Sequence, residues 1–249
     1  KQLADYKFVD ASHIIWELRM IKSKKEIAKI KDITSIASKA FDDLPNKIQI
    51  GLSEIEICNI MKKNLLDHGA DHTLYMSCAS GKGGYNQIIC DPTEKKLIEG
   101  DILAIDTGST LDGYFCDFDR NFGFGKIAES AKTTHHILWE AIENALAVCK
   151  PGNSCADVSY AMSKIIKKNN LNSNSIGRMG HGIGLQLTEP PSIMENDNTL
   201  LSENMIIAIE PSLEYAPNTM MVHEENVLIT GNGYEILSSR TPEKIPIIK

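Results

Sequence analysis

The stretch IDTGSTLDGYFCDFDR, residues 105–120, carries the strongest structural signal in the chain. It continues an apolar run over residues 102–105 and contains the turn dipeptide Asp112-Gly113, so we expect strands over 102–106 and 113–118 joined by that turn. Two carboxylates, those of Asp106 and Asp117, belong to these strands and not to a helix face. A carboxylate at the end of an apolar strand is costly to bury alone, so the pattern predicts a nearby counter-charge.

Three further polar residues occupy similar positions. Glu210 ends the apolar run 206–209, Glu224 precedes the run Glu-Asn-Val-Leu-Ile, and His181 lies between glycines in GHGIG. Carboxylate oxygens and imidazole suit Mn²⁺, Zn²⁺, Co²⁺ or Fe²⁺. Together with Asp106 and Asp117 they supply four carboxylates, enough to neutralise two divalent ions, and such a pair of ions can bridge a hydroxide and clamp a substrate oxygen during hydrolysis.

Taken one at a time, these residues also have ordinary explanations. Asp106 could be a turn acid, Asp117 could pair with Arg120, Glu210 could form a salt bridge, and His181 could be a buried histidine of the core. If these explanations held, five unrelated residues would have come to similar strand-end or turn positions independently. We therefore prefer the interpretation that the five residues share one site.

The flanking segments predict an α+β fold. We expect helices from Ser23, where Glu26 completes a capping box, to Pro45, from Ser53 to Gly69, over about 127–149 and from Ser154 to about Asn169. We expect strands over 72–79 and near 205–210, 220–230 and 234–237. Residues 1–22 lack a clear period and are interpreted as a linker segment in which Trp16 and Leu18 pack.

Residues 51–63 and 152–164 share a pattern at a constant offset of 101. Each copy has a glycine, a serine in a capping position, an acid three residues later, and then apolar residues and methionine at helical spacing. Many helices begin in this way, so the match could be accidental. Alternatively, the chain has two halves related by pseudo-symmetry, which share one continuous sheet and form a site between them.

Composition excludes several classes of protein. The 249 residues carry a net charge of −7, which argues against binding to nucleic acid or to anionic lipid. No apolar run approaches the roughly 18 residues that a membrane span needs. The six cysteines form no Cys-x-x-Cys pair, so we expect reduced thiols in a cytoplasmic protein.

Four blocks in this order, IDTGSTLDGYFCDFDR, GHGIGL, IAIEPSL and HEENVLIT, resemble the pita-bread metallopeptidases, the superfamily of methionine aminopeptidase, Xaa-Pro aminopeptidase, Xaa-Pro dipeptidase and creatinase. The resemblance implies a pseudo-twofold α+β fold, with a curved antiparallel sheet covered by helices. It implies a catalytic domain over residues 23–249. It also implies that residues 1–22 are a linker from a creatinase-like domain ahead of Lys1, and that the protein is a homodimer.

The resemblance also implies roles for the five residues. Asp106 would bind one metal ion, Asp117 and Glu224 would bridge two ions, and His181 and Glu210 would complete the second. Glu210 would also move the proton of the bridging water, so Glu210 and His181 are the catalytic candidates. The cofactors would be two divalent ions of Mn, Co, Zn or Fe. Glu224 is preferred to Glu225 because it lies three residues before Val227, as the ligand of the family does.

Three positions depart from the pattern of the peptidase members, and one of them is Asp119, which stands where threonine is common. Thr188 stands where a second histidine is common, and Ile89 replaces an upstream histidine. We name Thr188, His223 and Tyr85 as candidate substrate contacts. We expect Asp119 to pair with Arg120, and the histidine pair 135–136 to lie on the surface.

The resemblance favours a dinuclear hydrolase of the Xaa-Pro aminopeptidase or dipeptidase type. Its substrate would be a small peptide or a small amide or amidine. Two alternatives remain open. One is a non-peptidase enzyme of the same fold, such as an ectoine-hydrolase-like amidine hydrolase or a C–S lyase, and the other is a catalytically silent binding module.

Overall fold

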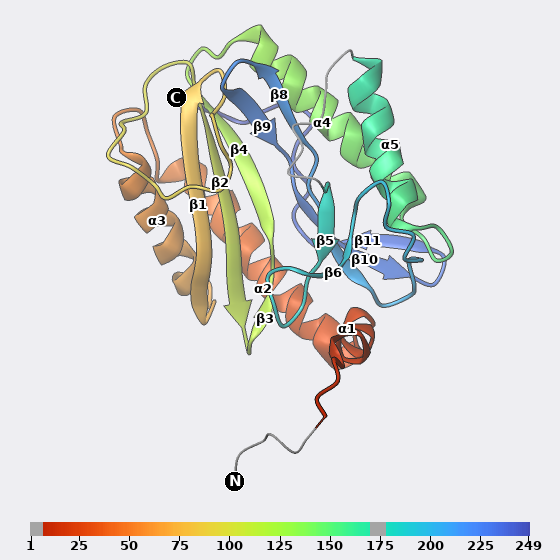
Figure 1. The fold of residues 1–249 in the computed structure, drawn as a ribbon. Helices are drawn as coiled ribbons and strands as arrows, with labels where there is room; N and C mark the ends of the chain where they lie inside the picture. Colours follow the sequence, from red (N-terminus) through yellow and green to blue (C-terminus); the bar gives the residue numbers. More distant parts are fainter. Residues whose placement is uncertain (1–6, 170–177) are drawn as a thin grey trace.

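The structure, a computed structural model, describes residues 7–169 and 178–249. Residues 1–6 of the expected linker segment lie outside the described residues. The strands form two five-stranded sheets and a separate two-stranded hairpin, with helices on their outer faces (Figure 1). The fold is therefore α+β, as predicted.

The first sheet belongs mainly to the N-terminal half. Its order is β1 (His72–Lys82), β2 (Asp101–Leu111), β4 (Phe118–Phe124) and β12 (Ile247–Ile248), and the short β3 (Tyr114–Phe115) also pairs with β2. Strands β1, β2 and β4 are antiparallel, whereas β12 runs parallel to β4. Helices α2 (Lys24–Asp43) and α3 (Glu54–Asp67), linked through the 3-10 turn Leu44–Asn46, lie against this sheet and share a buried apolar core with it.

The second sheet belongs to the C-terminal half. Its order is β11 (Gly233–Ile236), β10 (Glu225–Thr230), β7 (Ile206–Ile209), β5 (Gly180–Gly182) and β6 (Glu189–Ser192). Strands β8 (Ser212–Ala216) and β9 (Thr219–Val222) form the hairpin. Helices α4 (Glu129–Val148) and α5 (Cys155–Lys168) pack on these strands around the largest apolar core.

The two helical pairs repeat each other. Helices α2 and α4 have 20 residues each, and α3 and α5 have 14 residues each. Ser53 and Ser154 form the same capping box, and Gly51 and Gly152 before them have φ angles of 95° and 92°. A side chain would be strained at such an angle, so glycine is needed at both positions. This repetition supports two halves related by pseudo-symmetry.

Three expectations about individual elements are wrong. Helix α1 (Ser12–Met20) lies within the expected linker segment and buries none of its side chains, so Leu18, which we expected to pack, is 72% exposed. The strands expected over 113–118 and 220–230 are interrupted at Asp117 and Glu224. At Asp117 the backbone N–H donates to the side-chain oxygen of Asn226 and not to a neighbouring strand. The strands do not form one continuous sheet.

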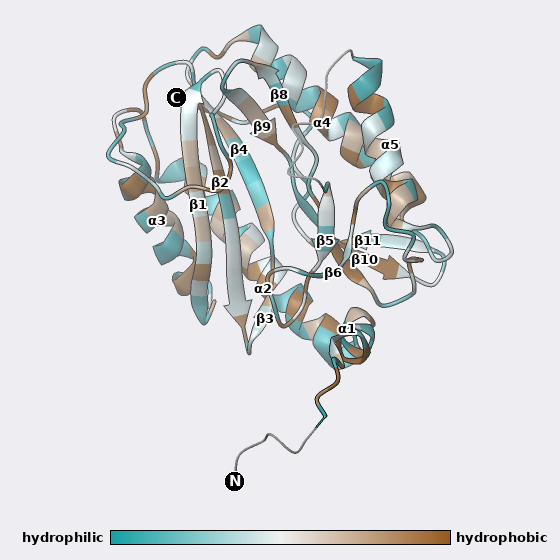
Figure 2. Ribbon diagram, in the orientation of Figure 1, coloured by the Kyte–Doolittle hydropathy of each residue, from teal (hydrophilic) through white to brown (hydrophobic). Residues whose placement is uncertain are grey.

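Burial in the first sheet extends to polar residues. Figure 2 shows a hydrophilic stretch in β4, which corresponds to residues 119–121. All three side chains are buried, with exposed fractions of 7% or less. Buried polar groups require partners, so this stretch indicates a polar centre inside the fold. No helix in the described ranges is long and apolar enough to cross a bilayer.

Candidate metal centre

The five predicted ligands line a single cavity of about 130 Å³. Asp106 lies in β2, Asp117 directly precedes β4, His181 lies in β5, Glu210 directly follows β7, and Glu224 directly precedes β10. Both halves therefore contribute, and the site lies between them. Four of the five side chains are buried, and the Glu210 side chain is 19% exposed.

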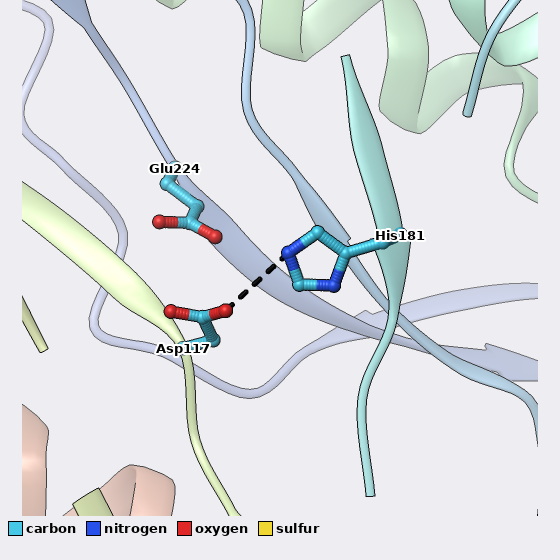
Figure 3. A group of neighbouring side chains, drawn as sticks. All are labelled: Asp117, His181 and Glu224. Atoms are coloured by element: carbon cyan, nitrogen blue, oxygen red, sulfur yellow. Dashed lines mark ion pairs between the residues drawn. The ribbon is translucent and has the colours of Figure 1, made fainter. Parts of the chain in front are cut away.

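Three of these residues form the centre of the cluster, shown in Figure 3. Candidate ligand atoms of Asp117, His181 and Glu224 all lie within 4.8 Å of one another. His181 Nε2 lies 3.3 Å from Asp117 Oδ2 and 3.6 Å from Glu210 Oε1. One ion could therefore contact donors from both sheets.

The imidazole of His181 is oriented for metal binding. Its Nδ1 lies 3.0 Å from the carbonyl oxygen of Gly182, so Nδ1–H donates to that oxygen. The proton is then on Nδ1, and Nε2 directs its lone pair at the carboxylates. A ring nitrogen held by a backbone carbonyl is the usual way in which proteins orient a metal-ligating histidine.

The carboxylates repel one another inside the protein. Burial, with the Asp117 charge as the next cause, raises the pKa of Asp106 to about 7. Burial also raises the pKa of Asp117 and of Glu224 well above the usual range, and their acidic neighbours act in the same direction. Asp106 Oδ1 and Glu224 Oε1 are buried without a hydrogen-bond partner. Divalent cations fit this donor set, because they would satisfy unpaired oxygens and offset the repulsion.

The geometry distinguishes Glu224 from Glu225. The Glu225 carboxylate turns away from the cavity and accepts hydrogen bonds from Arg120 at 2.9 Å and from Arg240 at 3.0 Å. Arg120 also donates to the backbone oxygen of Glu224 at 2.9 Å. Glu225 and the two arginines thus hold the backbone that presents Glu224.

The expected pairing of Asp119 with Arg120 is wrong. Arg120 forms its ion pair with Glu225 and reaches only the backbone oxygen of Asp119. The Asp119 carboxylate accepts a hydrogen bond of 2.8 Å from Asn121. Because Asp119 is the cross-strand partner of Asp106, both side chains lie on the same face of the sheet.

Two candidate substrate contacts lie outside the cavity lining, which corrects our assignment of Tyr85 and His223. The Tyr85 hydroxyl is buried, donates to Asn121 and accepts from the backbone N–H of Val222. His223 is buried behind Glu224, and its Nε2 lies 2.8 Å from Nδ1 of His135. His135 is fully buried as well and reaches the carbonyl of Pro242, so its expected surface position is also wrong; only His136 lies at the surface.

Thr188 does line the cavity, as does Ile89. The sequence did not single out Tyr75 and Arg178, which line it too. Tyr75 lies on β1 close to Asp106, and burial, with the Asp106 charge as the next cause, raises its pKa. Arg178 Nε lies 3.7 Å from Glu210 Oε1, and its Nη2 donates to Thr188 Oγ1 at 3.4 Å. Strand pairing could have indicated Tyr75, because β1 lies beside β2, but no sequence signal indicated Arg178.

The cluster of four carboxylates and one imidazole is a candidate metal site within an α+β fold. The family model for metallopeptidase family M24 matches residues 28–231, so the chain belongs to that family.

The chain is 30% identical over 236 residues to an uncharacterized peptidase of Staphylococcus haemolyticus. The match covers 92% of this chain and 65% of that relative, so the chain spans about two thirds of the relative's length.

Solved structures support the same family. The X-Pro aminopeptidase of Thermotoga maritima is 28% identical and superposes with a TM-score of 0.90, covering 98% of this chain and 69% of that one. The prolidase of Pyrococcus furiosus is 29% identical with a TM-score of 0.87, and the match covers 94% of this chain and 70% of the prolidase. The Xaa-Pro dipeptidase of Bacillus anthracis is 26% identical with a TM-score of 0.89, and the match covers 98% of this chain and 68% of the dipeptidase. The pita-bread fold predicted from sequence is therefore confirmed.

Proposed function

We propose that the protein is a dinuclear metal-dependent hydrolase of the Xaa-Pro aminopeptidase or dipeptidase type, acting on a short peptide. The observation that carries this proposal is the convergence of four carboxylates and one imidazole on a single cavity. Asp106, Asp117, His181, Glu210 and Glu224 would hold two ions. The names of the similar solved structures, among them a prolidase and an X-Pro aminopeptidase, support the substrate class.

The ions, when bound, would lower the pKa of a coordinated water and polarise the substrate carbonyl. The side chains of the cavity divide the remaining tasks. Glu210 is the partly exposed carboxylate of the set. Its Oε1 can take a proton from the attacking water and return that proton to the leaving nitrogen. Tyr75 lines the cavity beside Asp106, so its hydroxyl can donate a hydrogen bond to that carboxylate.

Part of the cavity lining is apolar, and this part, called here the apolar face, consists of Ile88, Ile89 and Leu187. An apolar substrate side chain or a proline ring fits that face, because burying it there removes apolar surface from water. Thr188 can donate a hydrogen bond to a substrate carbonyl, although a hydroxyl cannot titrate near neutrality.

A second candidate keeps the metal centre and changes the substrate to a small amide or amidine. It is favoured by the cavity lining itself, in which His181 is the one imidazole among the described residues. The histidines that peptidase members commonly add are replaced by Ile89 and Thr188.

The test combines metal binding and turnover. The protein, stripped with chelator and reloaded with Mn²⁺, Co²⁺ or Zn²⁺, should bind about two ions per chain and hydrolyse Xaa-Pro dipeptides or longer Xaa-Pro peptides. Asp117→Asn should lose bound metal and activity. The control is Asp112→Asn, because the Asp112 carboxylate lies in an exposed turn outside the cavity and pairs with Lys29.

Metal binding without turnover of any Xaa-Pro peptide would contradict the peptidase. Turnover of a cyclic amidine by the same preparation would then favour the second candidate. An Asp117→Asn variant that kept its metal would contradict the proposed centre itself.

A further inference from the structure

A short loop, residues 184–188, joins β5 to β6 and forms one wall of the cavity. It begins after Ile183, the residue that follows the strand carrying His181, and it places Leu187 and Thr188 in the lining. Leu187 lies against β2, because a Cβ added at Gly108 would come within 2.3 Å of its Cδ1. The position of this loop therefore sets the shape of the cavity between the two sheets.

The loop is folded around the carboxylate of Glu189. The backbone N–H of Gln186 donates to Glu189 Oε1 at 3.0 Å. A Cβ added at Gly184 would lie 2.9 Å from Glu189 Oε2, so the loop backbone approaches the carboxylate closely. Glu189 is 2% exposed, and its carboxylate is therefore a buried anion that needs compensation.

The compensating cations come from residues that precede α2. Arg19 Nη2 forms an ion pair with Glu189 Oε1, and Lys22 Nζ lies 3.6 Å from Oε2. Lys22 is only 3% exposed, which is unusual for a lysine and places its charge inside the fold. Arg19 also stacks over the ring of Trp16 at 4.6 Å.

These cations are fixed to the protein body independently of Glu189. Ile21 forms a backbone bridge with Met205, and the backbone N–H of Lys22 donates to Asn204 at 3.0 Å. Both partners lie just before β7, the strand that Glu210 directly follows. The segment that we expected to be a linker is thus tied to two sides of the cavity.

We propose that Arg19 and Lys22 are positioning residues of the active site, which hold the 184–188 loop in place through the carboxylate of Glu189 and so determine substrate affinity. They touch neither substrate nor metal. Removing either cation leaves the buried carboxylate partly uncompensated, and the loop moves so that water can reach it. The cavity wall then shifts while the five metal ligands, held by their own contacts, stay in place.

The first experiment does not depend on enzymatic activity. Amide hydrogen exchange across residues 184–189 is measured in the wild type, in Arg19→Gln and in Arg19→Gln/Lys22→Met. We expect exchange in this loop to rise about tenfold or more in the double variant, while exchange in β5 and β7 stays unchanged. The matched control is Lys31→Gln, which removes an exposed ion pair of 2.7 Å with Glu235 and leaves Glu189 and its two cations unchanged.

The second experiment is kinetic and rests on the proposed function. With Mn²⁺ and the dipeptide Ala-Pro, Arg19→Gln should raise KM about fivefold or more, with kcat within about twofold and bound Mn²⁺ unchanged. Arg19→Lys, which keeps the charge, should restore KM to within about threefold of the wild type. Adding Glu189→Gln to Arg19→Gln should recover part of the loss, because the pair becomes neutral.

The outcomes separate cleanly. Loop exchange and KM that stay at wild-type values, with only a lower unfolding temperature, would overturn the proposal and leave a purely structural ion pair. A fall in bound Mn²⁺ at unchanged KM would overturn it as well, because the cations would then act on the metal centre. Wild-type protein that binds Mn²⁺ but hydrolyses neither Ala-Pro nor any longer Xaa-Pro peptide would contradict the proposed function, and the exchange result alone would then decide.

Discussion

Glu224 and Glu225 are neighbours in sequence with opposite environments. Glu224 faces acidic side chains and has a buried oxygen without a partner, whereas Glu225 is fully buried between two arginines. The first carboxylate costs stability in the absence of metal, because like charges surround it. The second is compensated, and breaking a buried ion pair from one side typically costs about 3–5 kcal/mol.

The two residues should therefore respond in opposite directions to the same substitution. In chelator, Glu224→Gln should raise the free energy of unfolding, and Glu225→Gln should lower it by several kcal/mol. With metal present, Glu224→Gln should weaken metal binding, whereas Glu225→Gln should affect it less. Urea unfolding with and without Mn²⁺ checks this, and a stabilised Glu225→Gln variant would contradict it.

Single residues differ in how far the sequence predicts them. Asp106, Asp117, His181, Glu210 and Glu224 were predicted because each carries a polar group in or next to an apolar strand. Tyr85 and His223 lie outside the cavity lining, and the sequence could not show this because both residues lie between strands, where no alternation indicates which way a side chain points. Arg178 was missed because it reaches the cavity from the residues before β5, and only the pairing of strands brings it there.

At the level of elements, the capped helices are the most predictable part of the fold. Ser53 accepts from the backbone N–H of Glu56 at 3.2 Å, and Ser154 accepts from that of Asp157 at 3.1 Å. Local capping fixes both starts, whatever the tertiary surroundings. Helix α1 was missed because it buries no side chain, so no apolar stripe marks it in the sequence.

The two capping boxes should contribute equally to the stability of the fold. Ser53→Ala and Ser154→Ala should each lower the free energy of unfolding by about 1 kcal/mol. The two costs should add in the double variant, because the caps lie in different halves without shared partners. Thr133→Ala, at an exposed position within α4, serves as the control in thermal or urea unfolding. A double variant that costs clearly more than the sum would show that the caps are coupled.

At the scale of the whole molecule, the buried charges make stability depend on pH. In the metal-free protein the pKa of Asp106 is raised from 3.8 to about 7, and those of Asp117 and Glu224 are raised well above their usual values. A raised carboxyl pKa stabilises the fold below the unfolded pKa, and this contribution is lost as pH rises through the folded value. The pKa values of His181 and His223 are lowered from 6.5. These two histidines therefore make the fold more stable as pH rises, but only below about pH 6.5, where the unfolded chain binds the extra protons.

We therefore expect the metal-free protein to become less stable as pH rises from 6.5 to 8. In this window the histidines of the unfolded chain are largely neutral, so the carboxylates dominate the pH dependence. Each carboxyl group that releases its proton on unfolding lowers the free energy of unfolding by up to about 1.4 kcal/mol per pH unit. Urea unfolding in chelator measures the slope, which Glu224→Gln should reduce and Mn²⁺ should abolish or reverse. Stability that is constant across this window in chelator would contradict the assignment.

The proposed metal donors are divided by the turn at Pro151-Gly152. Asp106 and Asp117 precede this turn, and His181, Glu210 and Glu224 follow it. Two polypeptides obtained by cutting the chain there would each carry an incomplete donor set. Divalent ions would then join the fragments, so their reassembly would report the concentration of free metal, as in a complementation sensor.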